Sequence, residues 1–187
     1  MGSQAPYLKD FVVIALNTGM RKGEILSLRW SQIRNGFIYL EKMKSDEARQ
    51  IPISSDLDRY LKGIRRRQHL TSQHVFSDER GGFIRDIKIA FKSALSRAGI
   101  TDFRPHDLRH TFASHYLMRG GFLKRLKEVL GHKEIKTTMR YAHLSKEFAR
   151  AEIQILNGLT TSVNKHPSKT KKGPAYLASA HPEMGFF

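Results

Sequence analysis

The chain has 187 residues, 40% of them apolar, which is enough for one folded domain with a sizeable hydrophobic core. It has no cysteine, which excludes disulfides and thiolate metal sites, and no apolar run long enough to cross a bilayer. Lysine and arginine outnumber aspartate and glutamate by 33 to 17, giving a formal charge of +16. Residues 160–187 hold four lysines and one glutamate, so +13 remains on the folded part. Such a surface attracts polyanions, and we expect nucleic acid rather than an anionic membrane.

The N-terminal half predicts a buried helix, a second helix, two antiparallel strands joined by a long polar loop, and a third helix. Their ranges in chain order are 7–17, 22–30, 37–41, 50–54 and 55–70. Thr18-Gly19-Met20 separates the first two helices. Ser55, with two aspartates in the turn that follows, marks the start of the third. A further short strand is expected near residues 82–84, after the Gly81-Gly82 turn.

The C-terminal half predicts five helices separated by short breaks. Their ranges are 87–98, 106–118, 122–130, 134–143 and 145–157. Helices dominate and only one small antiparallel sheet is expected, so the fold class is α+β and mainly helical, with no alternating βαβ units. We expect a single domain over residues 4–159. Residues 160–187 are polar, basic and proline-containing, and predict a mobile tail with an apolar patch at its end.

Several residues with chemical potential fall in the segment 106–141. His106 and Arg109 share one helix face at i, i+3 spacing, whereas His110 is expected to face elsewhere. His132 follows Gly131, a residue suited to ending a helix, and so lies in a loop. Tyr141 lies nine residues further on, which on one continuous helix places it on the opposite face. His132 and Tyr141 therefore converge only if the chain turns between them.

Earlier in the chain, Arg21 precedes Glu24 by three residues, a spacing that suits either an ordinary ion pair or a carboxylate that orients a phosphate-binding guanidinium. Lys44 lies in the polar loop between the strands. Each residue alone has an ordinary structural explanation. Together they supply a hydroxyl nucleophile, cations for non-bridging oxygens and an acid for a leaving oxygen, the requirements of attack on a phosphodiester.

Four motifs in order resemble those of the tyrosine recombinases, the phage-integrase family. L-G-H-K-E-I-K-T-T-M-R-Y-A-H resembles the C-terminal signature, and H-D-L-R-H-T-F-A-S resembles the H-x-x-R box. L-N-T-G-M-R-K-G-E-I-L-S-L-R-W resembles the first arginine box. K-S-D-E-A-R-Q-I-P-I resembles the lysine hairpin, and Lys44 rather than Lys42 stands eight residues before Pro52, as that motif requires. The resemblance extends over residues 8–157.

The resemblance implies a role for each matching residue. Tyr141 attacks the scissile phosphorus and forms a 3′-phosphotyrosyl bond, while Arg21 and Arg109 hold the non-bridging oxygens. Lys44 protonates the departing 5′-oxygen, and His106 is the acid/base partner near the tyrosine. His132 donates a hydrogen bond to the phosphate, and Glu24 supports the arginine site.

The resemblance also implies the fold of a DNA breaking-rejoining enzyme, double-stranded DNA as partner, and chemistry that needs neither metal nor ATP nor any other cofactor. It implies a dimer or tetramer on DNA, possible exchange of C-terminal tails, and a cytoplasmic location. Such enzymes usually carry an N-terminal helical domain, so we expect an excised catalytic domain or a short variant. Phosphate contacts outside the site are expected from Arg65, Arg66, Arg67, Lys88, Lys92, Arg97, Lys124 and Arg125.

Two alternatives use the same residues. A type IB topoisomerase-like enzyme relaxes DNA without exchanging partners, although the spacing from Leu130-Gly131-His132 to Tyr141 favours a recombinase. A non-catalytic DNA-binding module would retain the fold without the activity. Four residues argue against it: Arg21, Lys44, Arg109 and Tyr141.

Overall fold

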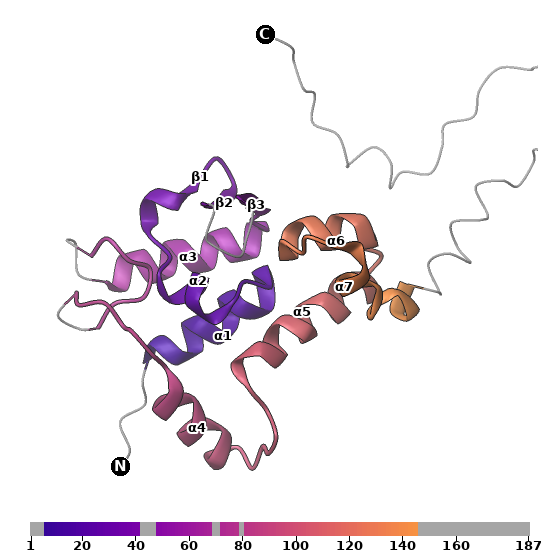
Figure 1. Cartoon of the computed structure of the whole chain (residues 1–187). Helices are drawn as coiled ribbons and strands as arrows, with labels where there is room; N and C mark the ends of the chain where they lie inside the picture. The colour runs from indigo at the N-terminus through magenta and orange to yellow at the C-terminus, as the bar shows by residue number, and fades with distance from the viewer. Residues whose placement is uncertain (1–5, 42–47, 69–71, 79–80, 146–187) are drawn as a thin grey trace, which may run out of the picture. The chain divides into compact units, whose positions relative to one another are not determined.

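A computed structural model describes residues 6–41, 48–68, 72–78 and 81–145. The predicted class is confirmed: the domain is mainly helical with one small antiparallel sheet (Figure 1). The elements in chain order are α1 (Pro6–Thr18), α2 (Lys22–Leu26), the 3-10 turn η1 (Trp30–Gln32), β1 (Ile33–Arg34), β2 (Phe37–Leu40), β3 (Arg49–Pro52), α3 (Ser55–Arg67), α4 (Lys88–Arg97), α5 (Pro105–Met118), α6 (Leu123–Leu130), α7 (Ile135–Met139) and the 3-10 turn η2 (Ala142–Ser145). The helix predicted over residues 145–157 and the predicted tail 160–187 lie outside the described residues, apart from Ser145.

The sheet has the order β1-β2-β3, with both pairs antiparallel. Ile38 on β2 stands opposite Ile51 on β3, and both side chains are buried, so this pair fixes the register of the hairpin. β1 was not predicted. The strand predicted near residues 82–84 is wrong, since only an isolated bridge between Ser77 and Phe83 forms there.

The second helix is shorter than predicted. It ends at Leu26 because the backbone beyond it bonds to another segment instead of continuing the helix. The amide of Val75 donates to the carbonyl of Leu28 at 2.8 Å, and the amide of Trp30 donates to the carbonyl of Gln73 at 3.0 Å. The last described helix is also shorter, since α7 ends at Met139 and η2 follows it.

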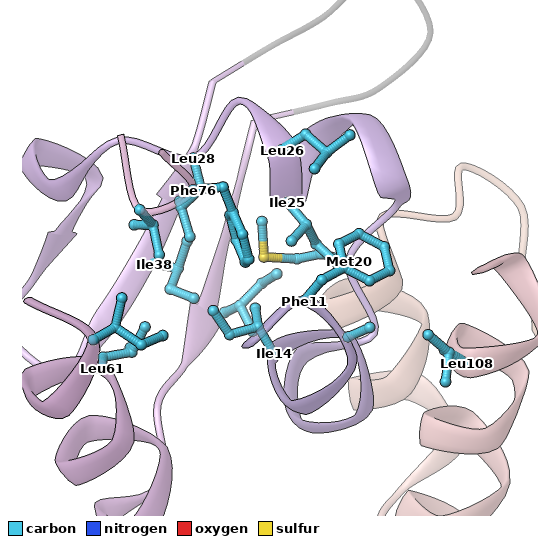
Figure 2. Close-up of a cluster of buried hydrophobic side chains, with 14 of the residues drawn as sticks. Phe11, Ile14, Met20, Ile25, Leu26, Leu28, Ile38, Leu61, Phe76 and Leu108 are labelled. Carbon is cyan, nitrogen blue, oxygen red and sulfur yellow. The ribbon is translucent and has the colours of Figure 1, made fainter. Parts of the chain in front are cut away.

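Two hydrophobic clusters form the interior. The larger gathers side chains from α1, α2, α3, α4, α5 and the sheet, and Figure 2 shows Phe11, Met20 and Ile25 meeting in it, with Leu108 of α5 at its edge. The smaller is formed by the C-terminal half of α5, by α6 and by the chain after α7; its buried members are Ala113, Leu117, Leu126, Leu130 and Tyr141.

Helix α5 connects the two clusters. It packs against α1 on the side of the larger cluster, and against α6 and η2 on the side of the smaller one. Pro105 starts the helix at its first position, where a missing amide donor costs nothing, and the Asp107 carboxylate accepts from the Arg104 amide at 2.7 Å. Within the described residues, no helix is both long and apolar enough to cross a bilayer.

Replacing Phe11 by alanine should test the larger cluster. Phe11 is fully buried and meets Phe76 edge-on, with ring centroids 6.2 Å apart, so the substitution should lower the free energy of unfolding by about 3–5 kcal/mol. Urea unfolding followed by circular dichroism measures this loss. Ile89→Ala is the control, because Ile89 is 87% exposed and the loss there should stay below about 0.5 kcal/mol. Equal losses at the two positions would contradict the assigned core.

Candidate active site

Arg109 is the most deeply buried charged residue of the predicted set, with 3% of its surface exposed. Its Nη1 donates to the carbonyl of Gly19 at 2.7 Å, and its Nη2 donates to the carbonyl of Leu130 at 2.5 Å. These carbonyls follow α1 and end α6, respectively. One guanidinium from α5 therefore joins the ends of two other helices. By donating to both carbonyls it forms the hydrogen bonds that a buried cation needs.

Two glycines allow the backbone to approach the arginines. Gly19 has φ 63° and Gly131 has φ 67°, the left-handed region that other residues avoid. A Cβ on Gly19 would lie 2.9 Å from Leu130 Cδ2, and a Cβ on Gly131 would lie 2.8 Å from Arg49 Nη1. Gly131 ends α6 in this conformation, as predicted.

Glu24 lies on α2 and is buried between two arginines. Its Oε2 accepts from the Arg21 amide at 2.7 Å, and Arg21 Nη1 stands 3.5 Å from its Oε1. The stronger ion pair is with Arg49, whose Nη2 donates to Oε2 at 2.8 Å. The side chain of Arg21 is 35% exposed, whereas those of Arg49 and Glu24 are 7% and 6% exposed. Arg21 is therefore partly exposed, and the buried Arg49 is linked to it through their shared partner Glu24.

Arg49 is a site residue that the sequence did not single out. It begins β3, and its Nε also donates to the carbonyl of Val129 on α6 at 3.0 Å. The hairpin is thereby attached both to the arginine site and to α6. In sequence, Arg49 is one charged residue beside a polar loop, which predicts a solvated side chain. Only its partners far along the chain reveal its position.

Tyr141 is 7% exposed and belongs to the smaller hydrophobic cluster. Its hydroxyl is hydrogen-bonded to Nδ1 of His110. Burial raises the pKa of Tyr141, and the positive charges of Arg140 and Arg109 lower that pKa in part. The tyrosine is therefore a neutral phenol at pH 7, held by His110 and within electrostatic range of Arg109.

The prediction that His110 faces away from the site is wrong. His110 follows His106 by four residues on α5, and i, i+4 neighbours share a helix face as i, i+3 neighbours do. Their ring centroids are 4.9 Å apart at an interplanar angle of 85°. Burial lowers the pKa of His106, and the charges of His110 and Arg109 lower it further. His106 is placed beside Arg109 as predicted, whereas His110 is the histidine that contacts the tyrosine.

His132 lies just past α6 and joins the same group. Its Nδ1 is 2.9 Å from the hydroxyl of Thr138, a fully buried residue on α7. Burial, reinforced by the charges of Arg109 and Arg21, lowers the pKa of His132 to about 4. The predicted break between His132 and Tyr141 exists, because α6 ends at Leu130 and α7 begins at Ile135. Arg109 acts electrostatically on both His132 and Tyr141.

Lys44 lies outside the described residues, and the hairpin motif remains the basis of its assignment. The predicted phosphate contacts differ in their surroundings. Arg65 Nη1 donates to the carbonyl of Ser72 at 2.7 Å, and Arg67 Nη2 pairs with Asp10 at 2.9 Å, so both have intramolecular roles. Arg97 and Arg125 bond to neighbours on their own helices. All eight side chains are exposed, and among the described residues the remaining four form no hydrogen bond or ion pair: Arg66, Lys88, Lys92 and Lys124.

The electrostatics of the site are strongly positive. The pKa of Arg109 is lowered to about 10, chiefly by burial and then by the positive charges of Arg21 and Arg49. The negative charge of Glu24 acts in the opposite direction and raises this pKa. The single carboxylate of Glu24 thus faces the positive charges of Arg21, Arg49 and Arg109. An anion that enters this site relieves the repulsion among them, so the arrangement is suited to bind a phosphate group.

Arg49→Leu should show how much the buried pair contributes. It leaves the Glu24 carboxylate without its nearest cation, so the free energy of unfolding should fall by about 3 kcal/mol. Arg59→Leu is the matched control, because the side chains of Arg59 and Asp56 are 78% and 83% exposed. Its effect should stay below about 1 kcal/mol. Urea denaturation of both variants measures the difference, and similar losses would show that the Arg49 pair does not stabilise the fold.

The stability of the protein should depend on His132 at acidic pH. An unfolded histidine titrates near 6.5, whereas the pKa of His132 in the folded state is about 4. The unfolded chain therefore binds more protons between these values, and the free energy of unfolding falls as the pH is lowered through them. In His132→Asn this contribution is absent, so the variant should lose less stability than the wild type from pH 7 to pH 4.5 in urea titrations. His115→Asn, an exposed position on α5, should follow the wild type. If the free energy of unfolding of His132→Asn falls with pH as steeply as that of the wild type, His132 does not cause the acid sensitivity.

Comparison with known proteins agrees with this geometry. Residues 2–147 match the Phage integrase family. The chain is 38% identical over 153 residues to the integrase of Escherichia phage 186, covering 80% of this chain and 41% of that protein. It is 30% identical over 176 residues to the tyrosine recombinase XerC of Staphylococcus epidermidis, covering 89% and 56%. The fold is similar to that of the catalytic domain of bacteriophage HP1 integrase, with a TM-score of 0.63 and 35% identity over 85% of this chain and 87% of that one.

The chain spans about half the length of the curated relatives it matches. The matching region contains all four motifs and the segments that bring Arg21, Arg109, His132 and Tyr141 together. The resemblance seen in the sequence is thus confirmed, and the chain belongs to the phage integrase family.

Proposed function

We propose that the chain is the catalytic domain of a site-specific DNA recombinase or integrase, which cleaves and rejoins DNA strands through a 3′-phosphotyrosyl intermediate. One observation carries the proposal: the neutral Tyr141 hydroxyl, hydrogen-bonded to His110, lies within electrostatic range of the buried Arg109, in a site where cations outnumber carboxylates. This combination suits attack on a phosphodiester, because the nucleophile and the groups that stabilise the developing charge are already in place. Family membership supports this function over topoisomerase-like relaxation and over a non-catalytic module.

The cleavage step assigns a task to each residue. The Tyr141 oxygen bonds to phosphorus and the 5′-oxygen leaves, while Arg21 and Arg109 stabilise the non-bridging oxygens. Arg109 has five N–H donors and uses one on each of two carbonyls, so it retains donors for the phosphate in a fixed orientation. His132 is neutral at pH 7, and the ring nitrogen that does not face Thr138 is available as a donor. Lys44 is proposed as the acid for the 5′-oxygen, and Glu24 as the support of Arg21.

The wider assembly follows from the same proposal. The catalytic domain extends over residues 4–159, and the basic tail 160–187 contacts DNA or a neighbouring protomer in a dimer or tetramer. The partner is double-stranded DNA, which the positive charge of the chain favours, in the cytoplasm where such DNA is found. Exposed Arg66, Lys88, Lys92 and Lys124 are the phosphate contacts best placed for it.

Tyr141→Phe should bind DNA but form no covalent adduct. The protein is incubated in EDTA with a panel of nicked suicide duplexes, and adducts are resolved on denaturing gels. The wild type should be trapped, whereas the variant lacks the attacking oxygen. Tyr116→Phe, which removes a half-buried hydroxyl elsewhere on α5, should be trapped like the wild type. An adduct that persists in Tyr141→Phe would exclude this residue as the nucleophile.

A further inference from the structure

The hydroxyl of Tyr141 has a histidine partner that neither the motif nor the family match assigned. His110 Nδ1 forms the hydrogen bond to this hydroxyl, and the two rings are tilted at 45° with centroids 5.9 Å apart. His106, the residue expected to exchange protons with the tyrosine, packs against the His110 ring in a T-shaped arrangement. The two histidines therefore occupy different positions relative to the nucleophile.

A buried tyrosine needs help to lose its proton. Burial raises the pKa of Tyr141 above its ordinary value of 10, so less than about 0.1% of it is ionised at pH 7. Its oxygen becomes a strong nucleophile only if a neighbouring base removes the proton as the bond to phosphorus forms. The base must lie within hydrogen-bond reach of the hydroxyl, and His110 meets this condition.

We propose that His110 is the general base that activates Tyr141, an inference that rests on the proposed function. The lone pair on His110 Nδ1 takes the phenolic proton and the O–H bond breaks. The tyrosine oxygen forms its bond to phosphorus, and the bond from phosphorus to the 5′-oxygen breaks. That oxygen receives its own proton from the acid, for which Lys44 is the candidate. In rejoining, His110 returns its proton to the tyrosine oxygen.

The surroundings of His110 keep it ready to accept a proton. Burial lowers the pKa of His110, the positive charges of Arg140, Arg109 and Arg104 lower it further, and the Asp107 carboxylate raises it. The nearby His106 ring has a lowered pKa as well. At neutral pH the imidazole is uncharged, and its Nδ1 accepts from the phenol when Nε2 carries the ring proton.

The test measures the single-turnover rate of adduct formation at saturating protein, on the suicide duplex that the wild type cleaves best. His110→Ala should react about 100-fold more slowly, which is the lower end of the contribution of a general base. His110→Gln retains a hydrogen-bonding group but no basicity, so it should be as slow. Added imidazole should restore part of the rate to His110→Ala alone. His115→Ala, the same substitution at an exposed position on α5, is the control and should match the wild type.

Other outcomes identify what has failed. A wild-type rate in His110→Ala or His110→Gln overturns the base and leaves the proposed function standing, because the adduct still forms through Tyr141. A duplex with sulfur in place of the bridging 5′-oxygen needs no acid; if it restores the His110→Ala rate, His110 acts on the leaving group instead. No adduct with the wild type overturns the proposed function and this inference together. Near-wild-type melting temperatures for the alanine and glutamine variants show that the slow rates are not due to unfolding.

Discussion

The site depends on one buried cation. Arg109 is almost inaccessible to water, and its guanidinium is held by the carbonyls of Gly19 and Leu130. Burial of an unpaired guanidinium costs several kcal/mol, so these two hydrogen bonds are a condition for the arrangement rather than a minor addition. Since the carbonyls come from the ends of α1 and α6, any change in the packing of these helices displaces the arginine. The position of the guanidinium that we propose to bind phosphate is thus set by the fold itself.

The balance of charge around Arg109 explains the other properties of the site. Glu24 is shared between Arg21 and Arg49 and leaves the group with an excess of positive charge. That excess, added to burial, keeps His132 uncharged and lowers the pKa of His106 and His110. Such a site is suited to bind an anion, and its imidazoles stay uncharged and able to accept protons at neutral pH. The unfavourable repulsion in the free protein becomes favourable binding when a phosphate enters.

Helix α5 has to satisfy both the core and the chemistry. Leu108 packs in the larger cluster and Ala113 and Leu117 in the smaller one. His106, Arg109 and His110 lie within the first two turns of the same helix. Tyr141 is itself part of the smaller cluster, so the proposed nucleophile also contributes to packing. Its hydroxyl is held in one orientation by His110. A reactive group fixed by packing needs little reordering before reaction, which is the usual source of preorganisation in catalytic sites.

The sequence by itself determined the helical class, most helix boundaries, the antiparallel hairpin and the residues that match the family motifs. These features are encoded locally, in hydrophobic periodicity, in Pro105 at a helix start and in Gly131 at a helix end. Only the tertiary structure decided that Arg49 shares Glu24 with Arg21, that His110 bonds to Tyr141, and that α2 stops at Leu26. The position of Arg49 and the end of α2 each depend on a partner 25 or more residues away. The contact of His110 with Tyr141 depends on how the chain after α7 packs against α5. Local patterns carry no information about such partners, because these contacts are selected by the packing of whole elements.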